Sequence, residues 1–157
     1  MYQRAVVSPE APAPAGPYSQ AIVAGQFVFL AGQRPAEPRT GAVQPGFTTQ
    51  VEQALSNVRA VLRSAGTDLP GIVKVTAYLS DLADFGRLNE VFRAWFTEPY
   101  PARTTVGARL RDVLVELDVT AVFPGDAASP SPARNVMPVP VPGADGRFTR
   151  AEESHVH

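Results

Sequence analysis

Cysteine is absent from the 157-residue chain, and its only two histidines, His155 and His157, stand two residues from the end and at the end. The lack of cysteine excludes disulfides, thiolate nucleophiles and cysteine-based metal sites. Because histidine is confined to the chain end, we expect neither a histidine general base nor a zinc centre in the fold. The sequence therefore predicts no metal site.

A strong positive charge and long apolar runs are also missing. The 14 lysines and arginines are balanced by 15 acidic residues, which gives a formal net charge of −1. A nucleic-acid binder would normally present a basic face. No apolar run approaches the roughly 20 residues that span a bilayer, and the N-terminus lacks a charged-then-apolar signal. We therefore expect a cytoplasmic protein that binds neither nucleic acid nor membrane.

The length and composition fit one globular domain followed by an extension. At 45% hydrophobic residues, the chain can bury one core but is short for two domains. Residues 124–157 contain six prolines and no periodicity, which is typical of a disordered tail. The apolar residues near Met137, together with Phe148, leave open an arm that packs on the fold or on a neighbouring subunit. We predict a domain over residues 1–123 and a proline-rich extension over 124–157.

Residue spacing predicts an α+β fold in the order β-β-β-α-β-α-β-β. Apolar residues recur every three or four positions over residues 48–65 and 82–96, which indicates two helices. We expect a capping box of Thr49 and Glu52 at the start of the first helix and Gly66 at its end. Alternating patterns predict the strands at residues 1–8, 18–24, 26–31, 72–79 and 113–122, with a further extended stretch at Arg103.

The two helices can cover only one face of this mixed sheet. In the strand at residues 72–79, Val73 and Val75 are expected on the covered face. The other face would still hold apolar side chains, among them Tyr78, Leu114 and Val122. A helix-free and partly apolar sheet face commonly forms a subunit interface.

The stretch over residues 101–122 carries the clearest chemistry. Glu116 and Asp118 project from the same face of the last strand, since they are two residues apart. Arg103 begins the preceding extended stretch. If the two strands pair or lie near each other, Arg103 and Glu116 can line one pocket for a small carboxylated substrate. We expect Asp118 to be structural or solvent-facing.

Several separated motifs resemble the Rid family, also called YjgF or L-PSP endoribonuclease-like. They are Ala15-Gly-Pro-Tyr-Ser-Gln-Ala, Val28-Phe-Leu-Ala-Gly-Gln, Ile72-Val-Lys-Val-Thr-Ala-Tyr-Leu-Ser-Asp-Leu, Phe85 with Asn89 and Phe92, Pro101-Ala-Arg-Thr and Val115-Glu-Leu-Asp-Val. The resemblance covers roughly residues 5–122. It implies a chorismate-mutase-like sheet with two helices on one face, assembled as a homotrimer with clefts between subunits.

The resemblance also implies an activity. RidA-type members, the reactive-intermediate imine deaminases, hydrolyse 2-aminoacrylate and 2-iminopropanoate to 2-oxo acids and ammonia without a cofactor. By motif, Arg103 would bind the substrate carboxylate and Glu116 would position or activate water. Four further positions would line the cleft: Tyr18, Gly32, Asn89 and Thr105.

Two other functions stay open. Ala31 stands where the family usually has serine, and the extension has no family counterpart. Both features favour a non-hydrolytic relative that binds or converts another imine or carbonyl intermediate in a dedicated pathway. Endoribonuclease activity, implied by the family's older name, is disfavoured because phosphate binding needs clustered cations.

Overall fold

The computed structural model describes residues 3–125, and within this range the elements follow the predicted order. Most of the predicted extension, with its two histidines, lies outside the described residues. Short 3₁₀ turns at Leu69–Gly71 and Leu82–Asp84 precede the fourth strand and the second helix. The strands and helices are β1 (Gln3–Val6), β2 (Ala21–Ala24), β3 (Phe27–Leu30), α1 (Phe47–Ala65), β4 (Ile72–Leu79), α2 (Phe85–Trp95), β5 (Ala102–Gly107) and β6 (Val115–Val122).

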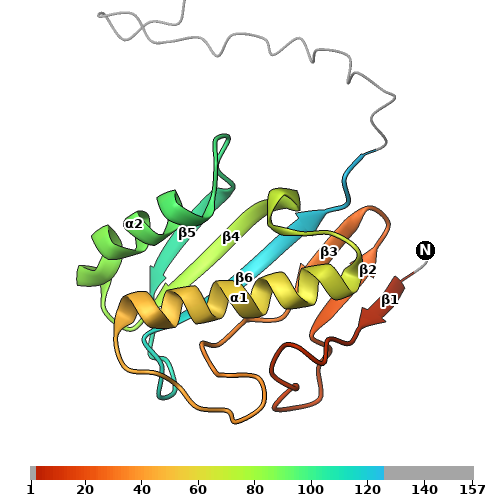
Figure 1. Cartoon of the computed structure of the whole chain (residues 1–157). Helices are drawn as coiled ribbons and strands as arrows, with labels where there is room; N and C mark the ends of the chain where they lie inside the picture. The colour runs from red at the N-terminus through yellow and green to blue at the C-terminus, as the bar shows by residue number, and fades with distance from the viewer. Residues whose placement is uncertain (1–2, 126–157) are drawn as a thin grey trace, which may run out of the picture. The chain divides into compact units, whose positions relative to one another are not determined.

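The six strands form one mixed sheet in the order β1-β2-β3-β6-β4-β5. Only β4 and β5 are parallel, and α2 supplies the crossover that a parallel pair requires. Both helices lie on one face of the sheet (Figure 1). The α+β prediction is therefore confirmed. The strand β5 forms one edge of the sheet.

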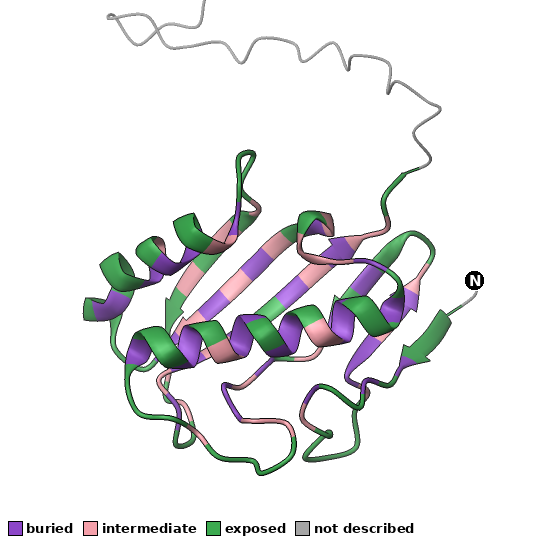
Figure 2. Cartoon of the chain, in the orientation of Figure 1, coloured by how far each residue is buried: buried purple, intermediate pink, exposed green. Residues whose placement is uncertain are grey.

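The core lies between this sheet face and the helices. Along β6 and most of β4, every second residue is buried, while α1 turns one apolar stripe toward the sheet (Figure 2). Burying a side chain of this size stabilises a fold by about 1.5–3 kcal/mol, so this layer holds the helices in place. Its fully buried members include Val51, Leu55, Val58, Leu62, Val75, Leu79, Leu88, Val115 and Leu117.

The predicted start of α1 is wrong, whereas its predicted end is confirmed. The helix begins at Phe47 after Gly46, and no side chain caps it. Thr49 therefore lies inside the first turn, where it cannot form a capping box with Glu52. At the other end Gly66 adopts the left-handed conformation (φ 106°), and its N–H donates to the carbonyls of Leu62 and Arg63.

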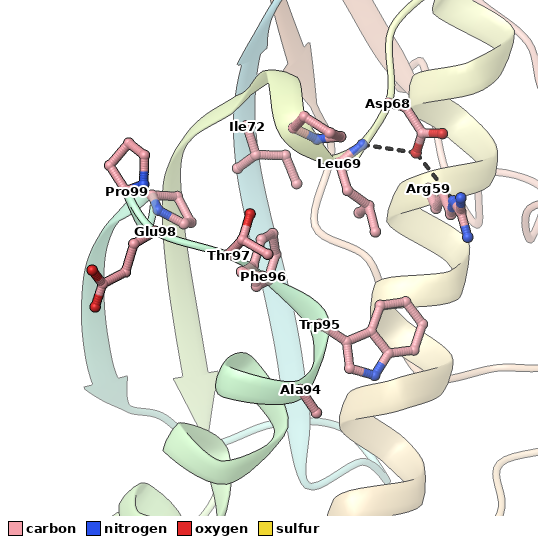
Figure 3. A pocket seen from close by; sticks show the side chains of 12 residues that line it. Arg59, Asp68, Leu69, Ile72, Ala94, Trp95, Phe96, Thr97, Glu98 and Pro99 are labelled. Atoms are coloured by element: carbon pink, nitrogen blue, oxygen red, sulfur yellow. Dashed lines mark hydrogen bonds and ion pairs between the residues drawn. The ribbon is translucent and has the colours of Figure 1, made fainter.

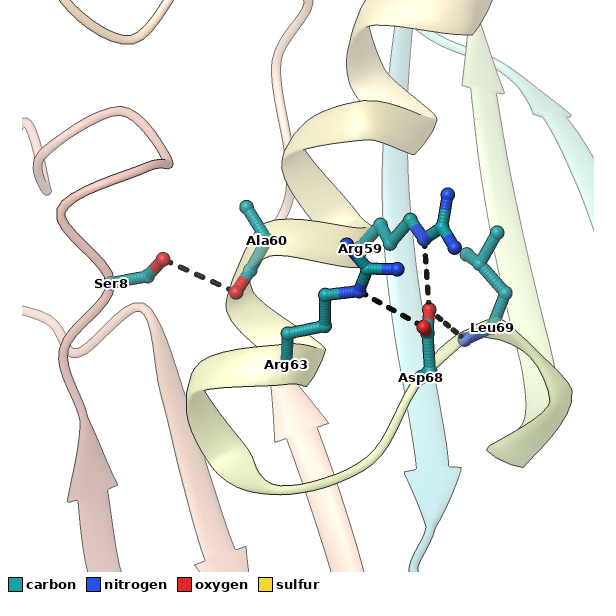
Figure 4. Close-up of polar contacts among 6 residues, drawn as sticks. All are labelled: Ser8, Arg59, Ala60, Arg63, Asp68 and Leu69. Atoms are coloured by element: carbon teal, nitrogen blue, oxygen red, sulfur yellow. Dashed lines mark hydrogen bonds and ion pairs between the residues drawn. The ribbon is translucent and has the colours of Figure 1, made fainter.

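Asp68 ties the end of α1 to the start of β4 (Figure 4). Its carboxylate accepts hydrogen bonds from the N–H of Leu69 at 2.7 Å, from Arg59 Nε at 3.1 Å and from Arg63 Nε at 3.0 Å. Burial alone would raise the pKa of Asp68, but these hydrogen bonds outweigh it and lower the pKa below its usual value. On the other side of α1, Ser8 Oγ donates to the carbonyl of Ala60.

A β-bulge changes which residues of β4 face the helices. Ile72 pairs with Ala121 and Lys74 with Thr120, so Val73 is an extra residue in the ladder. The predicted alternation is therefore wrong at its first step, because Val73 is exposed and Ile72 is buried. From Val75 onward the predicted faces are confirmed.

Three predicted boundaries also shift. The helix α2 ends at Trp95, and its predicted apolar stripe is wrong at Leu82 and Phe85, which are 55% and 46% exposed. The last strand begins at Val115 rather than at residue 113, and β2 begins only at Ala21. Leu114 packs against the core and does not belong to the uncovered face.

The sheet face without helices carries apolar and polar side chains side by side. Phe27 and Phe29 both point away from the core, with ring centroids 6.0 Å apart. Tyr78 and Val106 lie on the same face, because they pair in register and alternate with residues of the opposite face. We call this surface the open face.

Candidate functional site

Arg103 lies at the edge of the sheet, on β5, and its side chain reaches α2. Its Nη2 atom donates a hydrogen bond to Oδ1 of Asn89. The guanidinium carbon lies 4.7 Å from the ring centroid of Phe92 and 5.4 Å from that of Phe85, which is cation–π geometry. Partial burial lowers the pKa of Arg103, yet arginine stays charged at neutral pH. One helix face therefore holds the guanidinium in a fixed orientation.

A pocket of about 360 Å³ opens beside this guanidinium. Among the described residues that line it there is no aspartate or glutamate. No carboxylate within residues 3–125 lies within ion-pair distance of Arg103 either. The pocket thus offers an arginine that an anionic ligand can reach. Its lining consists of Asn89, Phe92, Arg93, Tyr100, Pro101 and Arg103.

Thr105 lies two residues beyond Arg103 on the same strand. It pairs with Ala77 of β4 as Arg103 pairs with Val75, so both project from the helix-covered face. Thr105 is half-buried. Three of the predicted site residues, Asn89, Arg103 and Thr105, therefore lie on or against one face of the sheet at its β5 edge.

The other three predicted residues lie elsewhere. Glu116 projects from β6 onto the open face, where it pairs in register with Tyr78. It covers Gly32 so closely that a Cβ atom added to Gly32 would lie 2.2 Å from Glu116 Oε1. Gly32 and Tyr18 line one small pocket of about 70 Å³. Tyr18 is exposed, and its hydroxyl accepts a hydrogen bond from the N–H of Ala15 at 2.9 Å.

Within one chain, Arg103 and Glu116 do not line a common pocket. Strand β4 separates β5 from β6, and the two side chains lie on opposite faces of the sheet. The condition on which the sequence prediction rested, that the two strands pair or lie near each other, is therefore not met within one chain. Residue spacing could not show this, because the faces depend on the register of both strands against β4.

Sequence reasoning also missed the aromatic contacts of Arg103. Phe85, Asn89 and Phe92 recur at positions i, i+4 and i+7, which places them on one helix face. In the sequence, Phe85 and Phe92 count as members of an apolar core stripe. Only the position of β5 against α2 shows that this face receives a guanidinium.

Buried side-chain amides hold the loops near Tyr18 and Gly32. Gln20 accepts from the N–H of Ser8 and donates to carbonyls that include those of Ser8 and Pro12. Asn57 of α1 donates to the carbonyls of Arg34 and Ala36 at 2.8 and 2.9 Å. These bonds satisfy loop carbonyls that would otherwise be buried without a partner.

A larger pocket, about 780 Å³, lies elsewhere, between α1 and the end of α2 (Figure 3). Arg59, Asp68 and Trp95 help to line it, and none of the six predicted site residues does. Its size alone does not connect it with the chemistry at Arg103. Among the described residues, no cluster of acidic or histidine side chains could hold a metal ion. No described helix is long and apolar enough to cross a membrane.

Comparison with known proteins decides the family. The model of the family described as Endoribonuclease L-PSP matches residues 8–123. The chain belongs to the Rid family. A RutC family protein of Pyrococcus horikoshii is 46% identical over 119 residues, which cover 74% of this chain and 94% of that protein. A 2-iminobutanoate/2-iminopropanoate deaminase of Salmonella typhimurium is 40% identical over 124 residues, or 76% of this chain and 97% of the deaminase.

Solved structures of Rid proteins share this fold. RidA from an Antarctic Psychrobacter superposes with a TM-score of 0.74 at 38% identity, covering 76% of this chain and 99% of its own. Escherichia coli TdcF, solved with bound serine, gives a TM-score of 0.74 at 36% identity, covering 77% and 99%. The Rid domain therefore accounts for nearly all of the described residues.

Proposed function

We propose that this protein hydrolyses small reactive imines and enamines of the 2-iminopropanoate and 2-aminoacrylate type to 2-oxo acids and ammonia. The observation that carries the proposal is Arg103, a guanidinium oriented by Asn89 and Phe92 in a pocket whose described lining has no acid. Such a group binds a carboxylate strongly. Family membership and relatives named as 2-iminobutanoate/2-iminopropanoate deaminases support the same activity.

The complete site would form between two copies of the chain. Each copy carries Arg103 with Asn89 and Thr105 at the β5 edge, and Glu116 with Gly32 on the open face. Because these groups project from opposite faces, one copy's Arg103 would meet the next copy's Glu116 in a head-to-tail contact. Repeated contacts of this kind form a ring when the rotation between copies closes, and a homotrimer, which we propose here, is the smallest such ring. The exposed Phe27 and Phe29 would be buried in this assembly.

In this mechanism Arg103 fixes the substrate carboxylate, and Glu116 orients a water molecule toward the imine carbon. The water oxygen bonds to that carbon, its proton passes to Glu116, and the C=N π electrons go to the protonated nitrogen. Glu116 then returns the proton to the amine. The C–N bond breaks and ammonia leaves, while the hydroxyl proton passes to the Glu116 carboxylate and the carbonyl forms. Orientation and exclusion of bulk water supply much of the rate, because a protonated imine is already electrophilic. Tyr18 and Thr105 would line the cleft.

A mixing experiment tests whether the site is shared. Arg103→Ala and Glu116→Gln proteins are assayed alone and after being dissociated and reassociated together in equal amounts. Each variant alone is expected to be inactive. In a randomly mixed ring about one site in four has both groups, so about a quarter of wild-type activity should return. If no activity returns although the mixed ring has formed, Arg103 and Glu116 of neighbouring copies do not act in one site.

The reaction itself is tested by generating 2-aminoacrylate enzymatically in the assay and following its disappearance. We expect the protein to accelerate hydrolysis beyond the spontaneous rate, and Arg103→Ala to abolish the acceleration. If the wild-type protein gives no acceleration, the non-hydrolytic alternative gains support. Ala31, which brings no hydroxyl next to Gly32, is the observation that favours that alternative.

A further inference from the structure

A second arginine, Arg93, lines the pocket of Arg103. Arg93 follows Asn89 by one helical turn on α2, so its side chain leaves the helix on the same side as the residue that holds Arg103. Two arginines therefore line one cavity of about 360 Å³.

Neither arginine is neutralised within the described part of the chain. The ion pairs found there involve four other arginines: Arg39, Arg59, Arg63 and Arg87. The contrast with Arg87 is informative, because Arg87 lies on the same helix and is paired with Asp84 at 2.9 Å. The described lining of the pocket also lacks acidic residues, so it contains two arginines and no protein counter-ion.

We propose that the preferred substrate of this site is a dicarboxylic imino acid, whose 2-carboxylate binds Arg103 and whose distal carboxylate binds Arg93. This inference rests on the proposed deaminase function and names its substrate class. A guanidinium binds a carboxylate through two parallel hydrogen bonds, which gives orientation as well as attraction. Tyr100 and Phe92 supply apolar walls for the carbon chain between the two anionic ends.

A purely structural role for Arg93 makes a different prediction. Arg93 lies in the last turn of α2, where a cation also interacts favourably with the helix dipole. In that role its loss would lower stability and would affect all substrates alike. A role in recognition changes the ratio between a charged substrate and a neutral one of equal size.

The test compares imines formed in situ from glutamate and from glutamine by an amino-acid oxidase. These two imines have nearly the same size and differ in the charge of the distal group. We expect wild-type kcat/KM to favour the glutamate-derived imine by about tenfold, the value of one favourable carboxylate–guanidinium pair. Arg93→Gln should bring the ratio close to 1, Arg93→Lys should restore part of it, and Arg87→Gln should leave it at the wild-type value.

Binding of stable 2-oxo acids separates this inference from the proposed function. Calorimetry with 2-oxoglutarate and 2-oxopentanoate needs no turnover, and wild-type protein should bind the dicarboxylate about tenfold more tightly. Arg93→Gln should abolish this preference. Hydrolysis of monocarboxylic imines without any preference for the charged ligand would overturn the dicarboxylate inference alone. Tighter binding of 2-oxoglutarate without hydrolysis of any imine would overturn the deaminase proposal and leave the two-anion site standing.

Discussion

Gly32 lies directly beneath the carboxylate of Glu116, and an added Cβ atom there would come within 2.2 Å of Oε1 and 3.0 Å of Cδ. Real Cβ atoms do not approach other atoms this closely, so the Glu116 side chain would have to move. The absence of a side chain at residue 32 therefore determines where the proposed water-orienting carboxylate lies.

Gly32→Ala is expected to lower kcat by about ten- to a hundredfold, because a displacement of about 1 Å at a reacting group has an effect of this size. Stability should change little, since the far end of Glu116 can move toward solvent. Kinetics and thermal unfolding measure the two effects separately. Gly86→Ala, in open space on α2, is the matched control and should retain activity. Unchanged kcat in Gly32→Ala would exclude Glu116 at its observed position from catalysis.

Asn89→Asp tests whether Arg103 must be free of an ion pair within the protein in order to bind the substrate. The new carboxylate would replace the neutral amide oxygen that accepts from Arg103, and an intramolecular ion pair would then compete with the substrate. We expect KM to rise by about tenfold or more, with kcat less affected. Steady-state kinetics on an in situ imine measures both constants. Glu90→Gln, the next residue on α2, serves as the control. An unaltered KM in Asn89→Asp would argue against substrate binding at Arg103.

Much of the fold followed from residue spacing alone, because long periodic segments have few alternative structures. The strand at residues 72–79 was predicted with its observed bounds, and the predicted helix over 48–65 differs from α1 by one residue. The errors have local causes. The bulge at Val73 depends on pairing with β6. The helix α1 starts at Phe47, which is buried in the core, so its N-cap position falls on Gly46, which has no side chain to cap it.

The candidate site was predictable as a set of residues but not as an arrangement. Motifs singled out Arg103 and Glu116, yet their opposite faces follow from the register of β5 and of β6 against β4, which lies between them. The aromatic rings against Arg103 were likewise invisible, because these contacts depend on how β5 packs against α2. Long-range register, rather than local propensity, sets these features.

Asp68→Asn should destabilise the protein at neutral pH and have little effect in acid. The lowered pKa of Asp68 means that its carboxylate contributes stability above the unfolded-state pKa of about 3.9. That contribution is lost as the pH falls through the lower folded-state pKa. We expect a deficit of about 1 kcal/mol at pH 7, since the ion pairs are partly exposed. The deficit should shrink below about pH 4.

Urea unfolding at several pH values measures this deficit. Glu52→Gln is a suitable control, because Glu52 is exposed and the capping box predicted for it does not form. It should unfold like the wild-type protein at every pH. An Asp68→Asn deficit that is the same at pH 7 and pH 3 would show that shape, and not charge, accounts for the role of Asp68.

The open face gives the last prediction, which concerns assembly. Phe29 is 47% exposed on β3, beside Phe27. This exposure is notable because burying a large aromatic side chain is favourable. If this face joins the copies of a ring, Phe29→Glu places a charge inside the contact and should yield a folded monomer without deaminase activity. Sedimentation velocity and circular dichroism test the mass and the fold. Val7→Glu, at a residue that is exposed just after β1, should keep the assembly.

The mass and the activity of the Phe29→Glu protein, taken together, show whether catalysis depends on assembly. A monomeric, folded and inactive Phe29→Glu protein links catalysis to assembly, as a site between copies requires. A Phe29→Glu protein that is monomeric and fully active would mean that one chain holds the complete site. That outcome is incompatible with a reaction that needs both Arg103 and Glu116, because these side chains lie on opposite faces of a single sheet. Assembly and catalysis must therefore fail together if the proposed site is correct.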